Sequence, residues 1–126
     1  MNVVDSSGWL EYFAGGPNAD FFAAAVEAID DLVVPTVSMY EVFKRVLQQR
    51  GEGNALQAIA LMQQGSVVEL TAPIALDAAR ASVELGLPMA DSFILATARA
   101  CQATLWTQDS AFEGIEGVRY VAHESL

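Results

Sequence analysis

The sequence predicts an α/β fold in which helices cover both faces of a mostly parallel sheet of four or five strands. Short β-rich stretches alternate with longer stretches of helical spacing along the 126 residues, a pattern typical of parallel sheets. Glycine and proline stand where helices should end or begin. The length suits one compact domain, so we expect residues 1–126 to form a single three-layer α/β/α unit.

Five stretches are predicted to be strands because they are short and rich in β-branched or large apolar residues. The first four have the character of buried strands, and the last is the weakest. In chain order they are Asn2–Val4, Asp31–Val34, Val67–Leu70, Thr104–Trp106 and Val118–Val121.

Six stretches between these strands have helical spacing and are bounded by residues that start or stop helices. The first is closed by Gly15 and Gly16, the third follows Pro35, and the fifth ends at Gly86. The predicted helices are Ser6–Phe13, Asn18–Ile29, Thr36–Arg50, Asn54–Gln64, Pro73–Leu85 and Pro88–Cys101. Ligands of open parallel sheets bind beyond the carboxyl ends of the strands, so polar residues at those ends are the candidate functional residues.

The bulk composition narrows the class of protein. Net charge is −10, from 6 basic and 16 acidic residues, which argues against binding nucleic acid by bulk attraction to phosphate. No apolar run approaches the roughly 20 residues that span a bilayer, and the first residues do not resemble a signal peptide. Cys101 is the only cysteine, so internal disulfides are ruled out and a reducing cytoplasm is expected. The low charged fraction, 17%, indicates that some apolar surface meets a partner.

Acidic residues recur at the predicted carboxyl edge of the sheet. Two directly follow strands, one starts the helix after a third strand, and one opens a late helix. They are Asp5, Asp109, Glu41 and Asp91, respectively. Loops after parallel strands share one edge of the sheet, so three of these acids are expected to converge there. Asp91 joins them if its helix begins at that edge.

Each acid alone also has an ordinary structural explanation. Asp5 and Asp109 suit helix N-caps, and Asp91 suits the first turn of a helix dipole. Glu41 has the spacing for a surface ion pair with Lys44 or Arg45. The argument for a functional site therefore depends on the whole set.

Four carboxylates at close range cannot all stay ionised without positive charge between them. The only histidine, His123, lies near the end of the sequence. Ligation by hard oxygens favours Mg²⁺ or Mn²⁺ over Zn²⁺. Such ions polarise a phosphoryl oxygen and lower the pKa of bound water.

These residues resemble the PIN domain, and length and spacing are similar to its VapC-type toxins. The likeness covers essentially the whole chain and rests on four pieces in a fixed order. They are Val3-Val4-Asp5-Ser6-Ser7, the internal Glu41, Ala90-Asp91-Ser92-Phe93-Ile94-Leu95-Ala96, and Thr107-Gln108-Asp109-Ser110-Ala111-Phe112. At Ser92-Phe93 the family more often has smaller or aliphatic residues.

The resemblance implies a Mg²⁺- or Mn²⁺-dependent endoribonuclease that cleaves RNA with metal-activated water. Asp5, Glu41 and Asp91 match its three most characteristic acids, and Asp109 matches a fourth that is less uniformly present. Thr107 matches a hydroxyl that supports the site, a role that Ser6 could share. The resemblance also implies a homodimer, held inactive by a small VapB-like antitoxin.

Two further groups of residues have a functional and a structural interpretation. Lys44, Arg45 and Arg50 form half of all Lys and Arg and would contact RNA, or they form an ordinary solvated helix face. An aromatic cluster in the first two predicted helices would form a groove for an antitoxin helix, or it packs in the core. Its members are Trp9, Tyr12, Phe13, Phe21 and Phe22. Cys101 is expected to be a small core residue.

Other aspartate-based functions fit less well. A receiver-type phospho-acceptor domain should have an Asp at the end of a middle strand and a Lys after a late one, and neither is present. A phosphatase of the Asp-x-Asp type needs an acid at Ser7. A catalytically inert PIN-like scaffold remains as an alternative, although such a protein would be expected to have lost acids.

Overall fold

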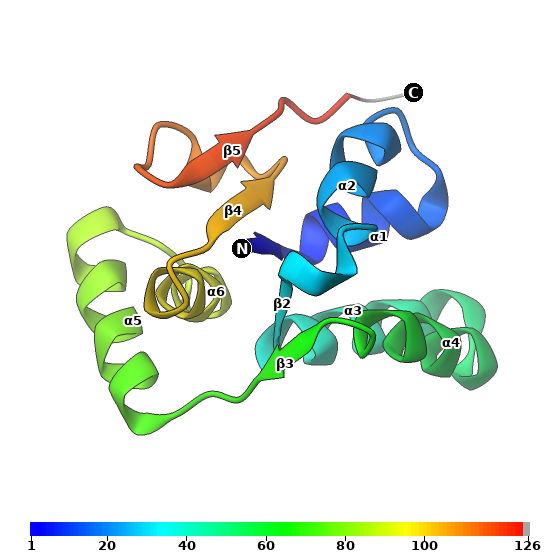
Figure 1. Ribbon diagram of the computed structural model, residues 1–126, viewed down its shortest axis with the longest axis horizontal. Helices are drawn as coiled ribbons and strands as arrows, with labels where there is room; N and C mark the ends of the chain where they lie inside the picture. The colour runs from blue at the N-terminus through cyan, green and yellow to red at the C-terminus, as the bar shows by residue number, and fades with distance from the viewer. Residues whose placement is uncertain (125–126) are drawn as a thin grey trace.

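The computed structural model describes residues 1–124, so the last two residues of the predicted domain lie outside the described part. Five strands form one sheet in the order β3-β2-β1-β4-β5, and all neighbouring strands pair in parallel. The strands are β1 (Asn2–Val4), β2 (Leu32–Pro35), β3 (Ser66–Val68), β4 (Thr104–Thr107) and β5 (Val118–Tyr120) (Figure 1). The predicted α/β class with a parallel sheet is therefore confirmed.

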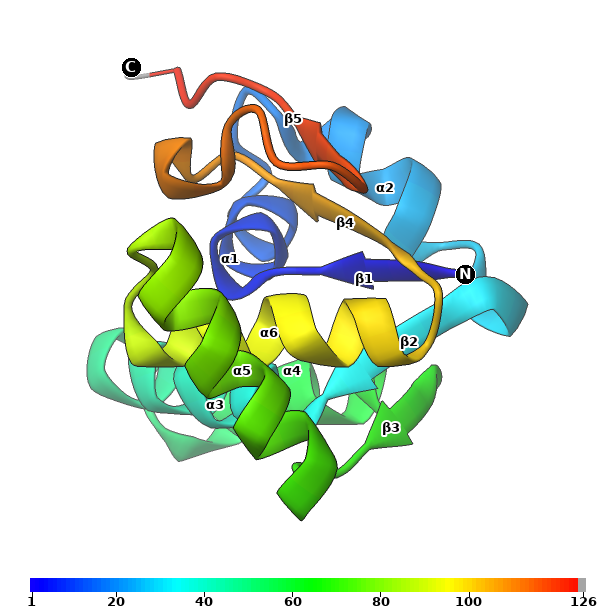
Figure 2. The ribbon, with the colours of Figure 1, turned by 90° about the vertical axis from the view of Figure 1, so that its left-hand side faces the viewer.

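The helices cover both faces of this sheet, as predicted. They are α1 (Ser6–Ala14), α2 (Ala19–Val26), α3 (Thr36–Arg50), α4 (Glu52–Met62), α5 (Ala72–Leu85) and α6 (Met89–Ala100). Figure 2 shows β1 at the centre, with α5 and α6 on the near side and α1 behind it. Within residues 1–124, no helix is both long enough and apolar enough to span a membrane.

Alternation of side chains along the strands divides the core into two layers. Val4 and Val34 are buried with Trp9, Phe22 and other side chains of α1 to α4. On the opposite face, β1, β2 and β4 contribute Val3, Val33 and Leu105, which pack against α5 and α6. Successive residues of the inner strands thus face different helices, which explains why the central strands are apolar on both sides.

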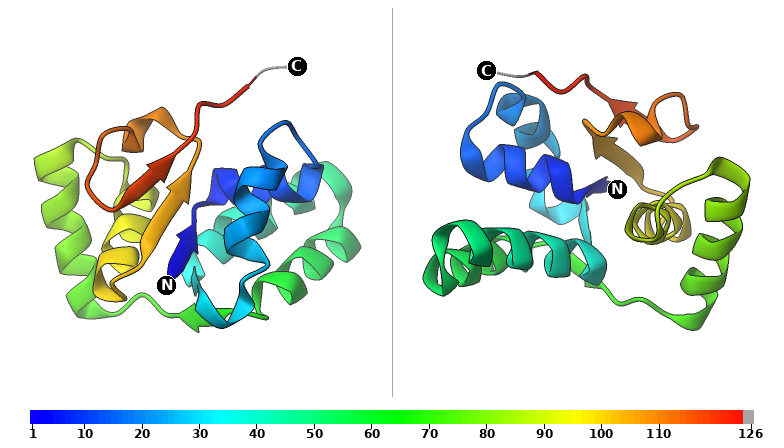
Figure 3. Two further views of the ribbon diagram at one scale, coloured as in Figure 1. Left: turned by 45° about the horizontal axis from the view of Figure 1, so that its top comes forward. Right: turned by 180° about the vertical axis from the view of Figure 1, so that it is seen from behind.

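The chain reverses its direction of travel across the sheet at β1. It moves from β1 through β2 to β3 with α1 to α4 on one face, and then crosses to β4 with α5 and α6 on the other. Figure 3 shows this division of the helices from two further directions. The switch point therefore lies beyond the carboxyl ends of β1 and β4, where open α/β folds bind ligands.

Several predicted boundaries were wrong for local reasons. The helix predicted over Asn18–Ile29 ends at Val26, and Ile29–Asp31 form a 3₁₀ turn, so β2 begins at Leu32 rather than at Asp31. The helix predicted from Asn54 starts earlier, at Glu52, directly after Gly51.

The strand predicted over Val67–Leu70 lies at Ser66–Val68 and is not buried. It pairs with β2 on one side and is the outer strand of the sheet, so most of it stays exposed.

The contact between α1, α2 and β1 depends on Gly8. A methyl group added there would lie 2.6 Å from Cε1 of Phe22 and 2.7 Å from Cγ1 of Val4. Both distances are shorter than any tolerated carbon contact, and both neighbours are fully buried. Gly53, in the first turn of α4, has nothing within 4 Å of the same position.

We predict that Gly8→Ala lowers the free energy of unfolding by about 1–3 kcal/mol, because the extra methyl overpacks the core. Gly53→Ala, the matched control, should raise it by up to about 1 kcal/mol, because alanine is the better helix former. Urea unfolding of both variants and the wild type measures the two differences. Equal effects of the two substitutions would show that the Gly8 contact is not tight.

Candidate functional site

Asp5 lies at the carboxyl end of β1 and caps α1, so the capping interpretation is correct and does not exclude a functional one. Its side chain is 3% exposed, and Oδ1 accepts from the Gly8 backbone N–H at 2.9 Å. The Ser7 hydroxyl donates to both carboxylate oxygens, at 2.8 and 3.0 Å, and the Thr107 hydroxyl donates to Oδ2 at 2.6 Å. Donors from α1 and β4 thus fix the orientation of one buried carboxylate.

Thr107 ends β4 and links Asp5 to Asp109. Its hydroxyl oxygen accepts from the Asp109 backbone N–H at 2.9 Å while its proton is donated to Asp5. Asp109 caps the next short 3₁₀ turn through the Ala111 N–H, at 2.9 Å. Thr107 is fully buried and Asp109 is half-buried, so one hydroxyl couples a buried acid to an acid at the surface of the site.

Glu41 lies in the second turn of α3 and is half-buried. Its Oε1 accepts from the Ser6 hydroxyl at 2.5 Å, which joins α3 to the start of α1. The expected alternative, an ion pair with Lys44 or Arg45, is wrong. Within residues 1–124 the only ion pair joins Arg80 and Asp77 on α5, at 2.7 Å.

Asp91 lies in the first turn of α6 and is half-buried. Burial raises its pKa to about 6, and repulsion from Asp109, Asp5 and Glu41 adds to the rise. Since all three act on it, α6 begins at the same edge of the sheet as the other acids. The structure therefore brings together the four predicted acids.

The site is electrostatically uncompensated. Burial raises the pKa of Asp5 to about 6, against the opposing effect of the hydrogen bonds from Thr107, Gly8 and Ser7. The charge of Asp109 raises it further. No basic side chain pairs with any of the acids, because the one ion pair among the described residues lies on α5. Carboxylates in this setting need a positive partner.

The four acids lie at one edge of the sheet, but they are not gathered around one common position. Among residues 1–124, no group of three acidic, histidine or cysteine side chains is already positioned to hold one metal ion. The charges of the other three acids all raise the pKa of Asp91. Their oxygen-only chemistry fits a hard divalent cation such as Mg²⁺ or Mn²⁺.

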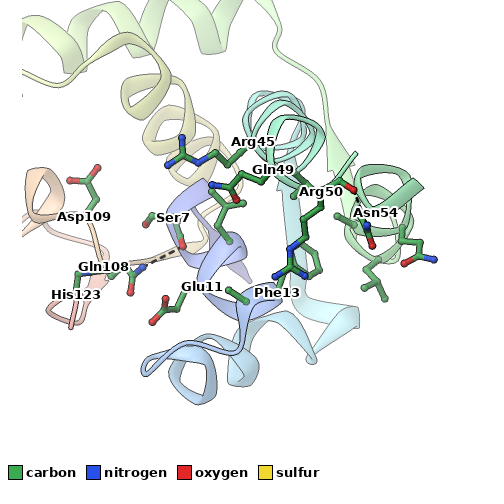
Figure 4. Close-up of a pocket in the computed structure, with 16 residues that line it drawn as sticks. Ser7, Glu11, Phe13, Arg45, Gln49, Arg50, Asn54, Gln108, Asp109 and His123 are labelled. Atoms are coloured by element: carbon green, nitrogen blue, oxygen red, sulfur yellow. Dashed lines mark hydrogen bonds between the residues drawn. The ribbon is translucent and has the colours of Figure 1, made fainter. Parts of the chain in front are cut away.

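A groove of about 580 Å³ opens beside the acids, between α1, α3 and α4 (Figure 4). Ser7 and Asp109 line one end of it, so the groove and the acidic site are continuous. Its remaining lining combines apolar side chains with polar ones. These are Leu10, Glu11, Phe13, Ala14, Arg45, Val46, Gln49, Arg50, Asn54, Gln57, Ala58, Leu61, Gln108 and His123.

A buried polar network supports the end of this groove, and the sequence analysis missed it. The Asn18 amide donates to Gln108 Oε1 and to the Ala122 carbonyl, both at 3.0 Å, and its backbone N–H donates to Glu11 Oε2 at 2.8 Å. These contacts hold the segment that follows β5 against α1, and His123 in that segment lines the groove. The available signal was Gln108, a polar residue directly after a buried strand.

The basic and aromatic candidates divide into separate groups. Arg45 and Arg50 line the groove, whereas Lys44 lies over the Tyr40 ring at 5.8 Å and does not line it. Trp9 and Phe22 are fully buried, so the core-packing interpretation holds for these two residues. Tyr12, Phe13 and Phe21 are only partly buried. Cys101 is half-buried against the core, as expected of a small apolar residue.

The fold and the site together define a doubly wound α/β domain with acidic side chains at the switch point of its parallel sheet. The sequence profile of the PIN domain matches residues 3–118. The chain belongs to the PIN domain family. The comparison with curated proteins found no match.

Solved structures with the same fold include several toxin–antitoxin proteins. A toxin–antitoxin complex from Klebsiella pneumoniae has a TM-score of 0.79 at 22% identity, covering 94% of this chain and 96% of that one. The DNA-bound VapBC of Salmonella typhimurium has a TM-score of 0.75 at 12% identity, covering 97% of this chain and 97% of that one. A VapC toxin of Mycobacterium tuberculosis, described as cleaving the sarcin–ricin loop, has a TM-score of 0.67 at 17% identity. The match covers 82% of this chain and 85% of that one. At these identities the likeness concerns the fold.

We predict that Asp5→Asn stabilises the protein in the presence of a chelator, because the isosteric amide removes a buried charge. The folded-state pKa of Asp5 is raised, so its contribution to stability is fully present below pH 3.8 and is lost as the pH rises through about 6. The stability difference between Asp5→Asn and wild type should therefore grow by about 3 kcal/mol over that window.

Urea unfolding at a series of pH values measures this difference. The control is Asp77→Asn, which removes an exposed carboxylate on α5 and should change stability little. A stability difference for Asp5→Asn that stays constant from low to neutral pH would contradict the prediction.

Proposed function

We propose that the protein is a Mg²⁺- or Mn²⁺-dependent endoribonuclease, acting as the VapC-like toxin of a toxin–antitoxin pair. The observation that carries the proposal is the set of Asp5, Glu41, Asp91 and Asp109 at one edge of the sheet, with no basic side chain to compensate them. Membership of the PIN domain family and the likeness to VapC folds support it.

In this proposal the four acids would bind the cation. Hydroxyl groups of neighbouring serine and threonine residues orient two of these acids by hydrogen bonds. Thr107 and Ser7 keep the Asp5 carboxylate in one orientation, and Ser6 does the same for Glu41. When bound, Mg²⁺ or Mn²⁺ supplies positive charge to a phosphoryl group and lowers the pKa of water. Outer hydroxyls of this kind set ligand geometry and so affect both metal affinity and rate.

The proposed reaction is hydrolysis of one phosphodiester bond of RNA. Water adds to phosphorus, the bond from phosphorus to the 3′ oxygen breaks, and that oxygen takes up a proton. The products carry a 5′-phosphate and a 3′-hydroxyl. No nucleophilic side chain is needed, since the attacking group is water, and Asp109 lies at the groove through which a substrate strand would reach the acids.

The partners proposed are a second copy of the chain and a small VapB-like antitoxin. Large apolar side chains are unusually exposed on α3, α5 and α6, which supports association. Tyr40 is 65% exposed, Leu76 60%, Val83 88% and Met89 71%. The solved toxin–antitoxin complexes with this fold support an antitoxin as the second partner.

We predict that the wild type cleaves RNA with added Mg²⁺ or Mn²⁺ and is inactive in excess chelator. Asp5→Asn, Glu41→Gln and Asp91→Asn should each lower the rate by at least roughly 100-fold, the loss that even outer partners of a metal site can cause. Asp109→Asn should have a milder effect, and Thr107→Val should cost roughly 10–100-fold. Gel analysis of a labelled RNA measures the rates and the end groups.

Glu84→Gln on α5 is the control, because this exposed acid lies in a different part of the surface. It should cleave RNA like the wild type. Full activity in chelator, or in Asp5→Asn, would contradict the nuclease and favour an inert PIN-like scaffold.

We also predict that light scattering finds a dimer or a complex with a co-expressed antitoxin. Leu76 and Val83 lie two turns apart on α5, so they share a face of the helix. Leu76→Glu combined with Val83→Glu should therefore shift the protein toward the monomer, whereas Gln63→Glu, at the end of α4, should not. A monomeric wild type that binds no antitoxin at micromolar concentration would refute both proposed partners.

A further inference from the structure

We infer that Asn18 is a positioning residue of the acidic site, although it is not one of the four acids. Its side-chain amide ties together the two segments that follow β4 and β5, and through Gln108 it fixes the position of Asp109. The inference rests on the proposed function, because it takes Asp109 as one of the acids that bind the cation.

Asn18 lies in the turn between α1 and α2, at the N-cap of α2. The side-chain oxygen of an asparagine at this position usually accepts a hydrogen bond from the first turn of the helix. Asn18 makes no such bond, and its amide contacts other segments of the chain instead. Capping of α2 therefore does not explain the side chain of Asn18.

The amide group of Asn18 bridges two segments that are distant from it in sequence. Its Nδ2 donates to Oε1 of Gln108 and to the carbonyl oxygen of Ala122, both at 3.0 Å. A backbone carbonyl can only accept, so the contact with Ala122 identifies the bonded atom of Asn18 as the nitrogen. An amide nitrogen carries two protons, so both donors of this group have a partner.

These two bonds extend the pairing of β4 with β5 beyond the ends of the strands. The Val121 N–H donates to the Thr107 carbonyl at 3.0 Å, and within residues 1–124 no backbone hydrogen bond joins the two segments farther along. Gln108 and Ala122 are the next residues of the two segments, and the Asn18 amide joins them. The side chain thus takes the place of the next hydrogen-bonded pair of the ladder.

The segment that Asn18 holds is part of the acidic site. Gln108 stands between Thr107 and Asp109, and the Thr107 hydroxyl bonds both Asp5 and the Asp109 backbone N–H. Within residues 1–124 the Asp109 carboxylate accepts only from Ala111, in its own short turn. No other element of this described part therefore holds that carboxylate directly. Its position relative to Asp5 depends on the backbone from Thr107 to Asp109, which Gln108 anchors.

The turn that carries Asn18 is itself firmly held. The Asn18 backbone N–H donates to Oε2 of Glu11 at 2.8 Å, and Glu11 is buried. A side chain at Gly16 would collide with the same carboxylate, so the turn packs directly on it. Asn18 and Gln108 are each 7% exposed, and amides as buried as these need their hydrogen bonds. Gln108 is therefore bonded to a part of the fold that does not move independently.

A purely structural role is the alternative. Asn18 would then only hold the segment after β5 against α1, and its loss would lower stability without changing the acids. The two roles differ in one measurable property, the affinity of the folded protein for a divalent cation. Removing an outer partner of a metal ligand weakens that affinity.

The test measures the affinity for Mn²⁺ by electron paramagnetic resonance, at a temperature at which every variant is folded. Asn18→Ala should weaken Mn²⁺ binding roughly ten-fold, the lower end of the effect of outer partners. Gln108→Leu keeps a side chain of similar size that cannot accept, and it should weaken binding by a similar factor. Because both changes break the same link, the two combined should lose much less than the product of the two factors.

Asn2→Ala is the matched control. The side-chain oxygen of Asn2 accepts from Nε1 of Trp106 at 2.9 Å, so this change also removes a long-range amide contact with β4, but from the amino end of β1. It should lower the stability to urea and leave Mn²⁺ affinity unchanged. An equal loss of affinity in Asn2→Ala, or none in Asn18→Ala, would overturn the inference. Losses that multiply fully when Asn18→Ala and Gln108→Leu are combined would overturn the link through Gln108.

Amide hydrogen exchange without metal separates this inference from the proposed function. Asn18→Ala should speed exchange of the Asp109 and Val121 backbone N–H groups roughly ten-fold, whereas Asn2→Ala should not. If the wild type binds no Mn²⁺ or cleaves no RNA but this exchange is faster, the nuclease proposal fails alone. If the wild type binds Mn²⁺ and cleaves RNA while Asn18→Ala changes neither exchange nor Mn²⁺ affinity, the positioning inference fails alone.

Discussion

The Asp5 carboxylate satisfies hydrogen-bond donors from two elements at once. It accepts from the first turn of α1 through Gly8 and Ser7 and from the end of β4 through Thr107. The backbone N–H of Asp5 also donates to the Trp106 carbonyl, so β1 and β4 are held in register at the same residue. Because Thr107 also accepts from the backbone N–H of Asp109, one hydroxyl fixes Asp5 and Asp109 relative to each other.

The buried carboxylates that the proposed function requires also lower the stability of the fold. Burial raises the pKa of Asp5 and of Asp91 to about 6, so at neutral pH the folded chain carries charges that its surroundings disfavour. Serine and threonine hydroxyls stabilise these charges without neutralising them. A cation that binds the folded state alone would relieve the repulsion and stabilise the fold by mass action. If the proposed function is correct, the bound cation supplies the positive charge that no side chain provides at this site.

Local sequence signals were sufficient for the elements that proline and glycine delimit. Thr36–Arg50 was predicted with its observed bounds, since Pro35 and Gly51 stand at its ends. The exposed position of β3 was not predictable, because it follows from the strand order rather than from Ser66–Val68. The contact of Asn18 with Gln108 joins residues 90 positions apart. The position of Asp91 near the other acids depends on where α6 begins in the folded chain. Both are properties of the tertiary fold.

Helix α3 shows how that fold separates charges that the sequence places together. Glu41 and Arg45 are four positions apart, a spacing that favours an ion pair on an isolated helix. In the fold, Ser6 of α1 takes the Glu41 carboxylate, and Arg45 lines the groove instead. If Glu41 and Arg45 formed an ion pair, neither charge would be available to a ligand. Because α1 packs against α3 beside Glu41, the same helix presents a carboxylate to the acidic edge and a guanidinium group to the adjoining groove. The packing of α1 on α3 therefore keeps Glu41 and Arg45 apart, although their spacing in the sequence would allow an ion pair.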